Sequence, residues 1–402
     1  MTGIRAYLDH NATSPLRPAA CGAVVAAMET VGNPSSVHGE GRNAKRIVEQ
    51  GRAKVAALVS AAPESVVFTS SATEAAHLAL TPNIRGDGIQ RDAGKLYVLE
   101  VEHPCVLAGG RFAPQDIVAI PVLESGLIDM DGFDALLDAH ENQSGRPYVA
   151  VQLVNSETGV VQPVAEVSKR VGFRGGYVVC DVVQAAGRIP IDIKNLGVDF
   201  LMLSAHKLGG PMGVGALVNA HAILDLAPAI RGGGQESNRR AGTENVPAIA
   251  GFGAAAKEAA VDACHYARIT TLRDSLEAGL ASICAALGLS DWPTIFGQDV
   301  ERVGNTTLFA LNGLKAETAL IAFDLDGVAV SSGSACSSGK IGNSHVLEAM
   351  NAAPKLADGA IRVSLGWNST QEDVAKFLAV FKRITADLAK RLGSETQDSA
   401  AA

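Results

Sequence analysis

Lys207 stands at a place where a reactive amine could do chemistry. It follows the apolar run Phe200–Leu203, ends the segment Ser204–Lys207 and precedes a turn that contains Gly209 and Gly210. A lysine at the end of a buried strand is partly desolvated, which lowers the pKa of its amine and lets it form a Schiff base with a carbonyl compound. A surface lysine is the common alternative, but the apolar run and the glycine turn make it less attractive here.

Two further motifs each follow an apolar run. Ser70–Glu74 comes after Val66–Thr69 and opens a helix, so its backbone N–H groups could bind a phosphate, or a hydroxyl could simply cap the helix. Asp181 comes after Tyr177–Cys180, where a carboxylate is costly unless it meets a positive group. That group could be the protonated ring nitrogen of a cofactor, and capping of the next helix is the alternative. The residues alone leave both choices open.

Arginine, glycine and threonine cluster in residues 231–243. The segment lacks the G-x-x-x-x-G-K-[ST] order of a nucleotide P-loop, so it reads either as an anion-binding loop or as a flexible surface loop.

Cys336 differs from the other cysteines in its surroundings. It lies in residues 331–339, a run of Ser, Gly and Ala with almost nothing to bury it, so it is a candidate nucleophile. The remaining five cysteines fit a small buried side chain better and contain no C-x-x-C pair, which argues against a structural zinc site and a disulfide framework. They are Cys21, Cys105, Cys180, Cys264 and Cys284.

The elements that must position these residues alternate along the chain. Continuous apolar runs indicate strands covered on both faces, as in a mainly parallel sheet flanked by helices. The predicted strands are Val66–Thr69, Leu96–Leu99, Ile117–Ile120, Tyr148–Val154, Tyr177–Cys180, Phe200–Leu203 and Gly215–Val218, and the predicted helices include Thr73–Leu80, Gly132–His140 and Pro163–Val171. In such α/β folds ligands bind at the carboxyl ends of the strands.

The alternation of strands and helices ends after Asn245. One long Ala-rich helix is predicted over Val246–Leu287, followed by a smaller α+β unit and a frayed tail from Gly393. In that unit the predicted strands are Thr306–Leu311 and Ile361–Leu365, and the predicted helices are Ala316–Asp324 and Gln371–Arg391. We therefore expect a large domain over 16–257 and a small domain built from 1–15 and 258–402, which carries Cys336.

Composition restricts the partners. The 402 residues include 34 Lys and Arg against 42 Asp and Glu, a net charge of −8, which argues against nucleic acid or an anionic membrane as a partner. No apolar run approaches the ~18 residues of a membrane span, and the N-terminus lacks a signal core. We expect a soluble cytoplasmic protein.

Taken in order, the motifs resemble the pyridoxal-phosphate-dependent cysteine desulfurases of the NifS/IscS type (group I), which have the class V aminotransferase fold, also called fold type I. The likeness extends from Leu8 to about Arg391. Six segments carry it: Gly32–His38, Ala72–Glu74, Asn155–Gly159, Ser204–Lys207, Arg240–Thr243 and Gly333–Cys336. It implies a large domain with a seven-stranded, mainly parallel sheet and a smaller α+β domain.

The resemblance implies a role for each matching residue. Lys207 would bind pyridoxal 5'-phosphate covalently and later carry protons, and His103 would stack on the ring as an acid or base. Asp181 would pair with the ring nitrogen, and Gln184 would bond the ring hydroxyl. The phosphate would be held by Ala72, Thr73, Ser204 and His206, with Thr243 from a second subunit. Substrate contacts would come from Asn33, Asn155 and Arg362, and Cys336 would take the sulfur as a persulfide.

The resemblance also implies partners, namely L-cysteine, a second copy in a homodimer, and a sulfur acceptor or iron–sulfur scaffold protein. The sequence ends soon after Arg391, without the longer tail that docks such a scaffold, and Ala205 stands where the family often has Gly. No fixed metal site is expected, and transient binding of an iron–sulfur cluster at Cys336 stays open.

Other functions remain as alternatives. They are a class V aminotransferase or selenocysteine lyase of the same fold, a non-catalytic sulfur-relay partner, and a hydrolase that pairs Cys336 with His345.

Overall fold

The computed structural model describes residues 5–86, 88–141, 144–221, 224–289, 293–333 and 344–400. Its largest sheet, among these residues, has seven strands in the order β2-β10-β9-β8-β7-β5-β6. β10 runs antiparallel to both of its neighbours, and the other pairs are parallel. The strands are β2 (Val66–Thr69), β5 (Ala93–Leu99), β6 (Ile117–Ile120), β7 (Arg146–Gln152), β8 (Tyr177–Asp181), β9 (Phe200–Ser204) and β10 (Gly215–Asn219). The predicted seven-stranded, mainly parallel sheet is confirmed.

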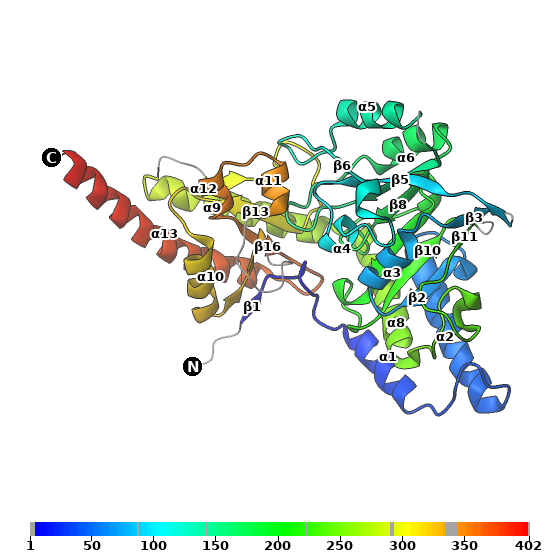
Figure 1. The fold of residues 1–402 in the computed structure, drawn as a ribbon. Coiled ribbons are helices and arrows are strands. Elements are labelled where there is room, and N and C mark those ends of the chain that lie inside the picture. Colours follow the sequence, from blue (N-terminus) through cyan, green and yellow to red (C-terminus); the bar gives the residue numbers. More distant parts are fainter. Residues whose placement is uncertain are drawn as a thin grey trace.

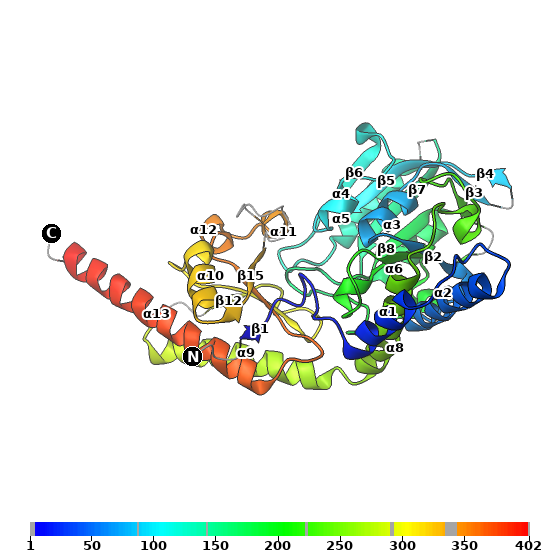
Figure 2. The same ribbon diagram turned by 90° about the horizontal axis from the view of Figure 1, so that it is seen from below.

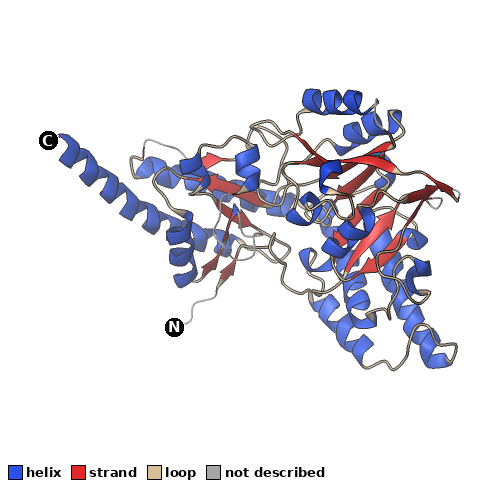
Figure 3. Cartoon of the chain, viewed as in Figure 1, coloured by secondary structure: helices blue, strands red, loops and turns tan. Residues whose placement is uncertain are grey.

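Helices cover both faces of this sheet (Figures 1 and 3). Successive strand residues point to opposite faces, so Val178 and Cys180 join one buried cluster while Tyr177 and Val179 join another. The first face is covered by α2 (Gly39–Leu58), α5 (Met130–His140), α6 (Val164–Phe173) and α8 (Val246–Cys264), and the second by α3 (Ala72–Ala79) and α4 (Pro104–Leu107). α1 (Pro18–Met28) packs on α8. Because helices cover both faces of the sheet, successive residues of each strand are buried, which explains the continuous apolar runs.

A second, antiparallel sheet follows in the order β12-β13-β16-β15. Its strands are β12 (Thr294–Ile295), β13 (Thr306–Ala310), β15 (Ser331–Ser332) and β16 (Ile361–Ser364). α10 (Ala316–Leu325) packs near it, and α9 (Ala267–Ala286) and α13 (Gln371–Ala400) lie side by side (Figure 2). β1 (Ala6–Tyr7) pairs in parallel with β14 (Val328–Ala329), so the start of the chain joins its C-terminal part. The proposed domain boundaries agree with this pairing but stay a prediction.

Two sequence predictions are wrong in the C-terminal half. The single helix over 246–287 is two helices, because His265 after α8 leaves the helical region (φ −124°, ψ 27°). α8 buries its apolar side chains in the core of the large sheet and α9 in the second core, so the chain must turn between them. The tail is not frayed from Gly393, since α13 continues to Ala400.

Short elements complete the described chain. They are β3 (Ile84–Gly86), β4 (Ile89–Gln90), β11 (Leu224–Leu226), α7 (Ile193–Leu196), α11 (His345–Ala349) and α12 (Pro354–Ala357). In the described part of the chain, every helix is too short or too polar to cross a membrane.

Candidate active site

The carboxyl ends of the parallel strands meet at one edge of the large sheet, and a cavity of about 190 Å³ lies there. It unites eight of the predicted site residues, Ala72, Thr73, His103, Asp181, Gln184, Ser204, His206 and Lys207. Each lies at the end of a strand or shortly after it, which explains why residues far apart in the sequence share one cavity. Its other lining residues are Ser71, Cys105, Gln152, Val154, Ser156 and Val183.

Lys207 ends a 3-10 turn that follows β9 directly. Its Nζ donates hydrogen bonds to the backbone carbonyl of Asn11, at 2.5 Å, and to that of Ala12, at 2.8 Å. Gly209 after it has a φ of +80°, and a Cβ there would lie 2.9 Å from the Pro15 carbonyl oxygen. Only glycine fits that turn, and the turn brings Lys207 against the N-terminal segment.

Asp181 is half-buried at the end of β8. Burial raises the pKa of its carboxyl, while the hydrogen bond from the Val183 N–H and the neighbouring His103 and Lys207 act in the opposite direction. Its Oδ1 accepts a hydrogen bond from the Val183 N–H at 2.8 Å. The helix-capping alternative is wrong, because the next helix is α7, whose N-cap is Asp192. The carboxylate is therefore available to a cation in the cavity.

His103 presents a neutral imidazole to the cavity. Burial and the neighbouring Lys207 lower its pKa, although Asp181 acts in the opposite direction. The backbone N–H of Cys105 donates to His103 Nδ1 at 3.2 Å, so the ring proton belongs on Nε2. The Cys105 thiol lies 3.0 Å from Nδ1, and burial raises its pKa to about 12. Cys105 therefore stays a thiol.

The N-terminus of α3 forms another wall. Ser71 caps the helix, its Oγ accepting from the Glu74 N–H at 3.2 Å, so the capping alternative is confirmed. It does not exclude anion binding, because Ala72 and Thr73 still line the cavity. His206 lines the same cavity, and burial together with Lys207 lowers its pKa to about 4, which keeps it neutral at neutral pH.

The residues that line this cavity fit pyridoxal phosphate. The N-terminus of α3 suits its phosphate, and the carboxylate of Asp181, which needs a cation to stay ionised in a partly buried place, suits its protonated ring nitrogen. The amine of Lys207 suits its aldehyde. The three features lie around one cavity.

Arg362 and Asn155 lie beside the cavity rather than in its lining. Arg362, fully buried on β16, donates to the Ser156 carbonyl at 3.1 Å and pairs with Asp9 at 3.0 Å. Its Nε is buried and has no partner among the described residues. Asn155 Nδ2 donates to the Val101 carbonyl at 3.1 Å. Ser156, to which the sequence analysis gave no role, lines the cavity, follows Asn155 in the chain and accepts the hydrogen bond from Arg362.

Asn33 and Thr243 lie elsewhere in this chain. Asn33 is exposed in the loop after α1, where its Oδ1 accepts from the Ser35 N–H at 2.9 Å. Thr243, also exposed, lines a neighbouring cavity of about 160 Å³ with Ser70 and Arg240.

Cys336 lies outside the described residues, but Gly333 and Ser344, which flank its segment, both lie close to Glu157. Ser344 Oγ donates to Glu157 Oε2 at 2.6 Å, and a Cβ on Gly333 would lie 2.6 Å from that same oxygen. His345, the partner in the hydrolase alternative, has its Nε2 at 2.9 Å from the Glu102 carbonyl oxygen. Both flanks therefore start next to Ser156 and the cavity.

Sequence reasoning missed Asn11. Its side-chain Nδ2 donates hydrogen bonds to the Ser156 carbonyl and to Thr306 Oγ1, both at 3.0 Å. Its backbone carbonyl accepts a hydrogen bond from Lys207 Nζ. Only its place in the motif that begins at Leu8 singled it out.

Comparison with known proteins agrees with this geometry. The family model for class-V aminotransferases matches residues 6–377. The cysteine desulfurase IscS of Dictyoglomus turgidum is 36% identical over 389 residues, 95% of each chain. A cysteine desulfurase of Cereibacter sphaeroides is 37% identical over 391 residues, 96% of each chain. The solved structure of a NifS-like protein from Rickettsia africae has a TM-score of 0.82 at 34% identity, over 95% of this chain and 99% of that one.

Proposed function

The chain belongs to the class-V aminotransferase family, and from this premise we propose that it is a cysteine desulfurase that uses pyridoxal phosphate. It would convert L-cysteine to L-alanine and pass the sulfur on through Cys336. One observation supports this activity beyond membership of the family. The Lys207 amine, the Asp181 carboxylate and the N-terminus of α3 surround a single cavity. Gly333 and Ser344, which flank the segment with Cys336, both lie next to Glu157 beside that cavity.

The chain's own groups would share the work as follows. Bound there, pyridoxal phosphate supplies an electron sink for the substrate's carbon. Arg362, with a buried Nε that lacks a partner among the described residues, is suited to the substrate carboxylate, with Asn155 beside it. Lys207 Nζ would move the α-proton, and His103, neutral with its proton on Nε2, would donate or accept at the ring face.

Cys336 would complete the sulfur transfer. Its thiolate attacks the substrate sulfur, so a sulfur–sulfur bond forms while the bond between that sulfur and Cβ breaks. The electron pair of the broken bond stays with the carbon, which takes up a proton and leaves as alanine. L-cysteine and the enzyme thiol thus become L-alanine and an enzyme persulfide, and no outside oxidant or reductant is needed.

The function is tested by incubating the holoenzyme with L-cysteine and following alanine and sulfide, with and without a reducing thiol. We expect both products, with sulfide release faster when the thiol is present. Absence of alanine at every cysteine concentration would overturn the proposal.

Replacement of Asp181 by Asn should lower kcat about 10²-fold, because a neutral amide no longer stabilises the positive ring nitrogen. The measurement is the rate of alanine release at saturating cofactor. Asp199→Asn is the matched control, since Asp199, directly before β9, accepts a hydrogen bond from the Val178 N–H of β8 and does not line the cavity. Equal rates for the two variants would contradict the role given to Asp181.

We also propose a homodimer with two shared sites. Thr243 is exposed and lines a separate cavity, so the role of phosphate ligand requires a second copy. Large apolar side chains stand exposed on α1 and the following loop, among them Met28 at 71% and Val31 at 82%, which is what a buried contact with another subunit would use.

The double substitution Met28→Glu with Val31→Glu should convert the dimer to a monomer and weaken cofactor binding by at least about tenfold. Light scattering after gel filtration gives the mass, and titration of the apoenzyme gives the affinity. Phe173→Glu is the control, because this side chain is 91% exposed but lies at the end of α6. A monomeric wild type with full activity would contradict the proposal.

A sulfur acceptor or iron–sulfur scaffold protein as partner, a role in iron–sulfur cluster assembly and a cytoplasmic location stay predictions.

A further inference from the structure

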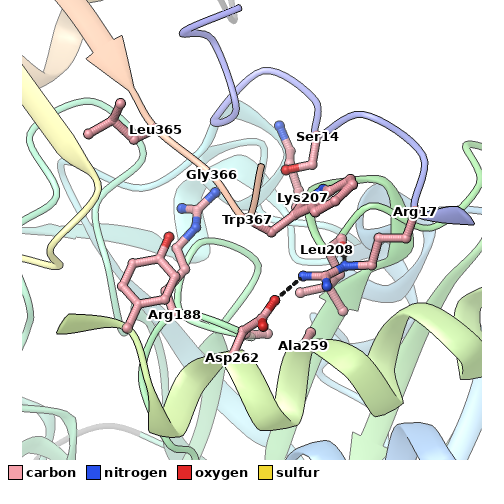
Figure 4. Close-up of a pocket in the computed structure, with 13 residues that line it drawn as sticks. Ser14, Arg17, Arg188, Lys207, Leu208, Ala259, Asp262, Leu365, Gly366 and Trp367 are labelled. Carbon is pink, nitrogen blue, oxygen red and sulfur yellow. Dashed lines mark hydrogen bonds and ion pairs between the residues drawn. The ribbon is translucent and has the colours of Figure 1, made fainter. Parts of the chain in front are cut away.

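Arg188 is a buried cation, 5% exposed, that has no carboxylate partner among the described residues. The other buried arginines, Arg17, Arg52 and Arg362, each pair with a carboxylate. In Figure 4 the ion pair of Asp262 runs to Arg17 and none runs to Arg188. Burying a charge without a counterion is costly, so Arg188 calls for another explanation.

The hydrogen bonds of Arg188 lead to one residue of the active site. Its Nη1 donates to the backbone carbonyl of Gln184, at 2.9 Å, and to the side-chain Oε1 of the same residue. Gln184 Nε2 donates to the Asn11 carbonyl at 3.0 Å. A guanidinium only donates and a carbonyl only accepts, so the amide of Gln184 cannot be turned over.

This orientation determines what Gln184 offers to the cavity that it lines. One proton of Nε2 is used by the Asn11 carbonyl, which also receives the Lys207 amine. The second proton of Nε2 is left to donate a hydrogen bond into the cavity, and Oε1 already accepts one from Arg188. Gln184 is therefore a donor on that wall, polarised by a positive charge behind it.

We propose that Arg188 is a positioning residue, which fixes the amide of Gln184 as a hydrogen-bond donor to an anionic oxygen of the bound cofactor. The inference rests on the proposed function, in which that oxygen is the ring hydroxyl in its ionised form. Arg188 acts through Gln184 and does not itself touch the cofactor.

The groups that face Arg188 leave its charge uncompensated. Burial raises the pKa of Tyr266 to about 12, so its hydroxyl stays neutral. Burial and Arg188 together lower the pKa of His10 to about 3, so its ring is neutral too. Arg362 is a further cation, already paired with Asp9. The positive charge thus acts on the Gln184 amide and, beyond it, on the cavity that also holds Lys207, His103, Asp181 and His206.

The test is a pH titration of the visible absorbance of the holoenzyme without substrate. In Arg188→Met the midpoint should rise by about one pH unit, because the deprotonated chromophore loses a polarised donor. In a Gln184→Ala background, adding Arg188→Met should cause no further shift, because the residue through which Arg188 acts is gone. Arg188→Lys keeps the charge and should shift the midpoint by less than half as much.

Arg17→Met is the matched control, because Arg17 is equally buried and lines the same small cavity as Arg188 and Lys207, yet is paired with Asp262. It should leave the midpoint unchanged. An unchanged midpoint in Arg188→Met, or a shift that persists in the Gln184→Ala background, would overturn the proposal. If the Met variant does not fold, Arg188→Gln, which also removes the charge, is compared in both backgrounds with the same criteria. Alanine release by the wild type tests the proposed function separately, because the titration needs no turnover.

Discussion

Replacement of Lys207 by Ala is expected to slow alanine release from L-cysteine about 10³-fold or more. The variant loses the amine that would bind the cofactor covalently and move the substrate's proton. Neither neighbour can replace it, because the imidazole rings of His103 and His206 have no primary amine to form a Schiff base and their lowered pKa values make them weaker bases than the Lys207 amine. The rate is measured at saturating cofactor, so that weaker cofactor binding does not account for the loss.

Borohydride reduction followed by mass spectrometry checks the covalent link. The wild type should carry the cofactor on the peptide that contains Lys207, and Lys207→Ala should carry none. Lys169→Ala, an exposed lysine on α6, is the control and should behave as the wild type. Covalent cofactor on another lysine of Lys207→Ala would contradict the assignment.

Replacement of Cys336 by Ser is expected to abolish persulfide formation and sulfide release. A serine hydroxyl is a far weaker nucleophile than a thiolate at neutral pH and cannot carry sulfur as a persulfide. The spectral change on adding L-cysteine should persist, because Lys207 and Arg362 remain. Separating substrate binding from sulfur transfer is what distinguishes a carrier cysteine from an incidental one.

Cys105 provides the sharpest comparison, because it is a cysteine that does line the cavity. With a pKa raised to about 12, it stays a thiol, and Cys105→Ser should still form the persulfide on Cys336. Cys264→Ser, an exposed thiol on α8, is the neutral control. Sulfide release at the wild-type rate from Cys336→Ser, lost when Cys105 is also replaced, would make Cys105 the acceptor.

The strand-end residues were predictable from the sequence because their positions follow from local patterns. An apolar run gives the strand, parallel strands share a carboxyl edge, and so Asp181 and Lys207 had to approach each other. The same local reading could not find Asn11 or Arg188. Asn11 matters through a hydrogen bond from a residue 196 positions away, and Arg188 matters because its cation is buried, and a linear pattern displays neither.

Other errors arose where local pattern and tertiary packing disagree. The apolar stretch after Asn245 favours one helix, yet it serves two separate cores and must break at His265. Asn33 and Thr243 do not line the cavity of their own chain. For Thr243 this agrees with the role that the resemblance implies, contact from a second subunit, and both roles stay predictions.

The most direct test of the central claim is a single turnover without reductant. Holoenzyme is mixed with one equivalent of L-cysteine, alanine is quantified, and the cysteine peptides are examined by mass spectrometry. The proposal predicts one alanine per site and one additional sulfur atom on the peptide that contains Cys336, removed by a reducing thiol. Alanine with an unmodified Cys336, or the additional sulfur on another cysteine, would contradict it.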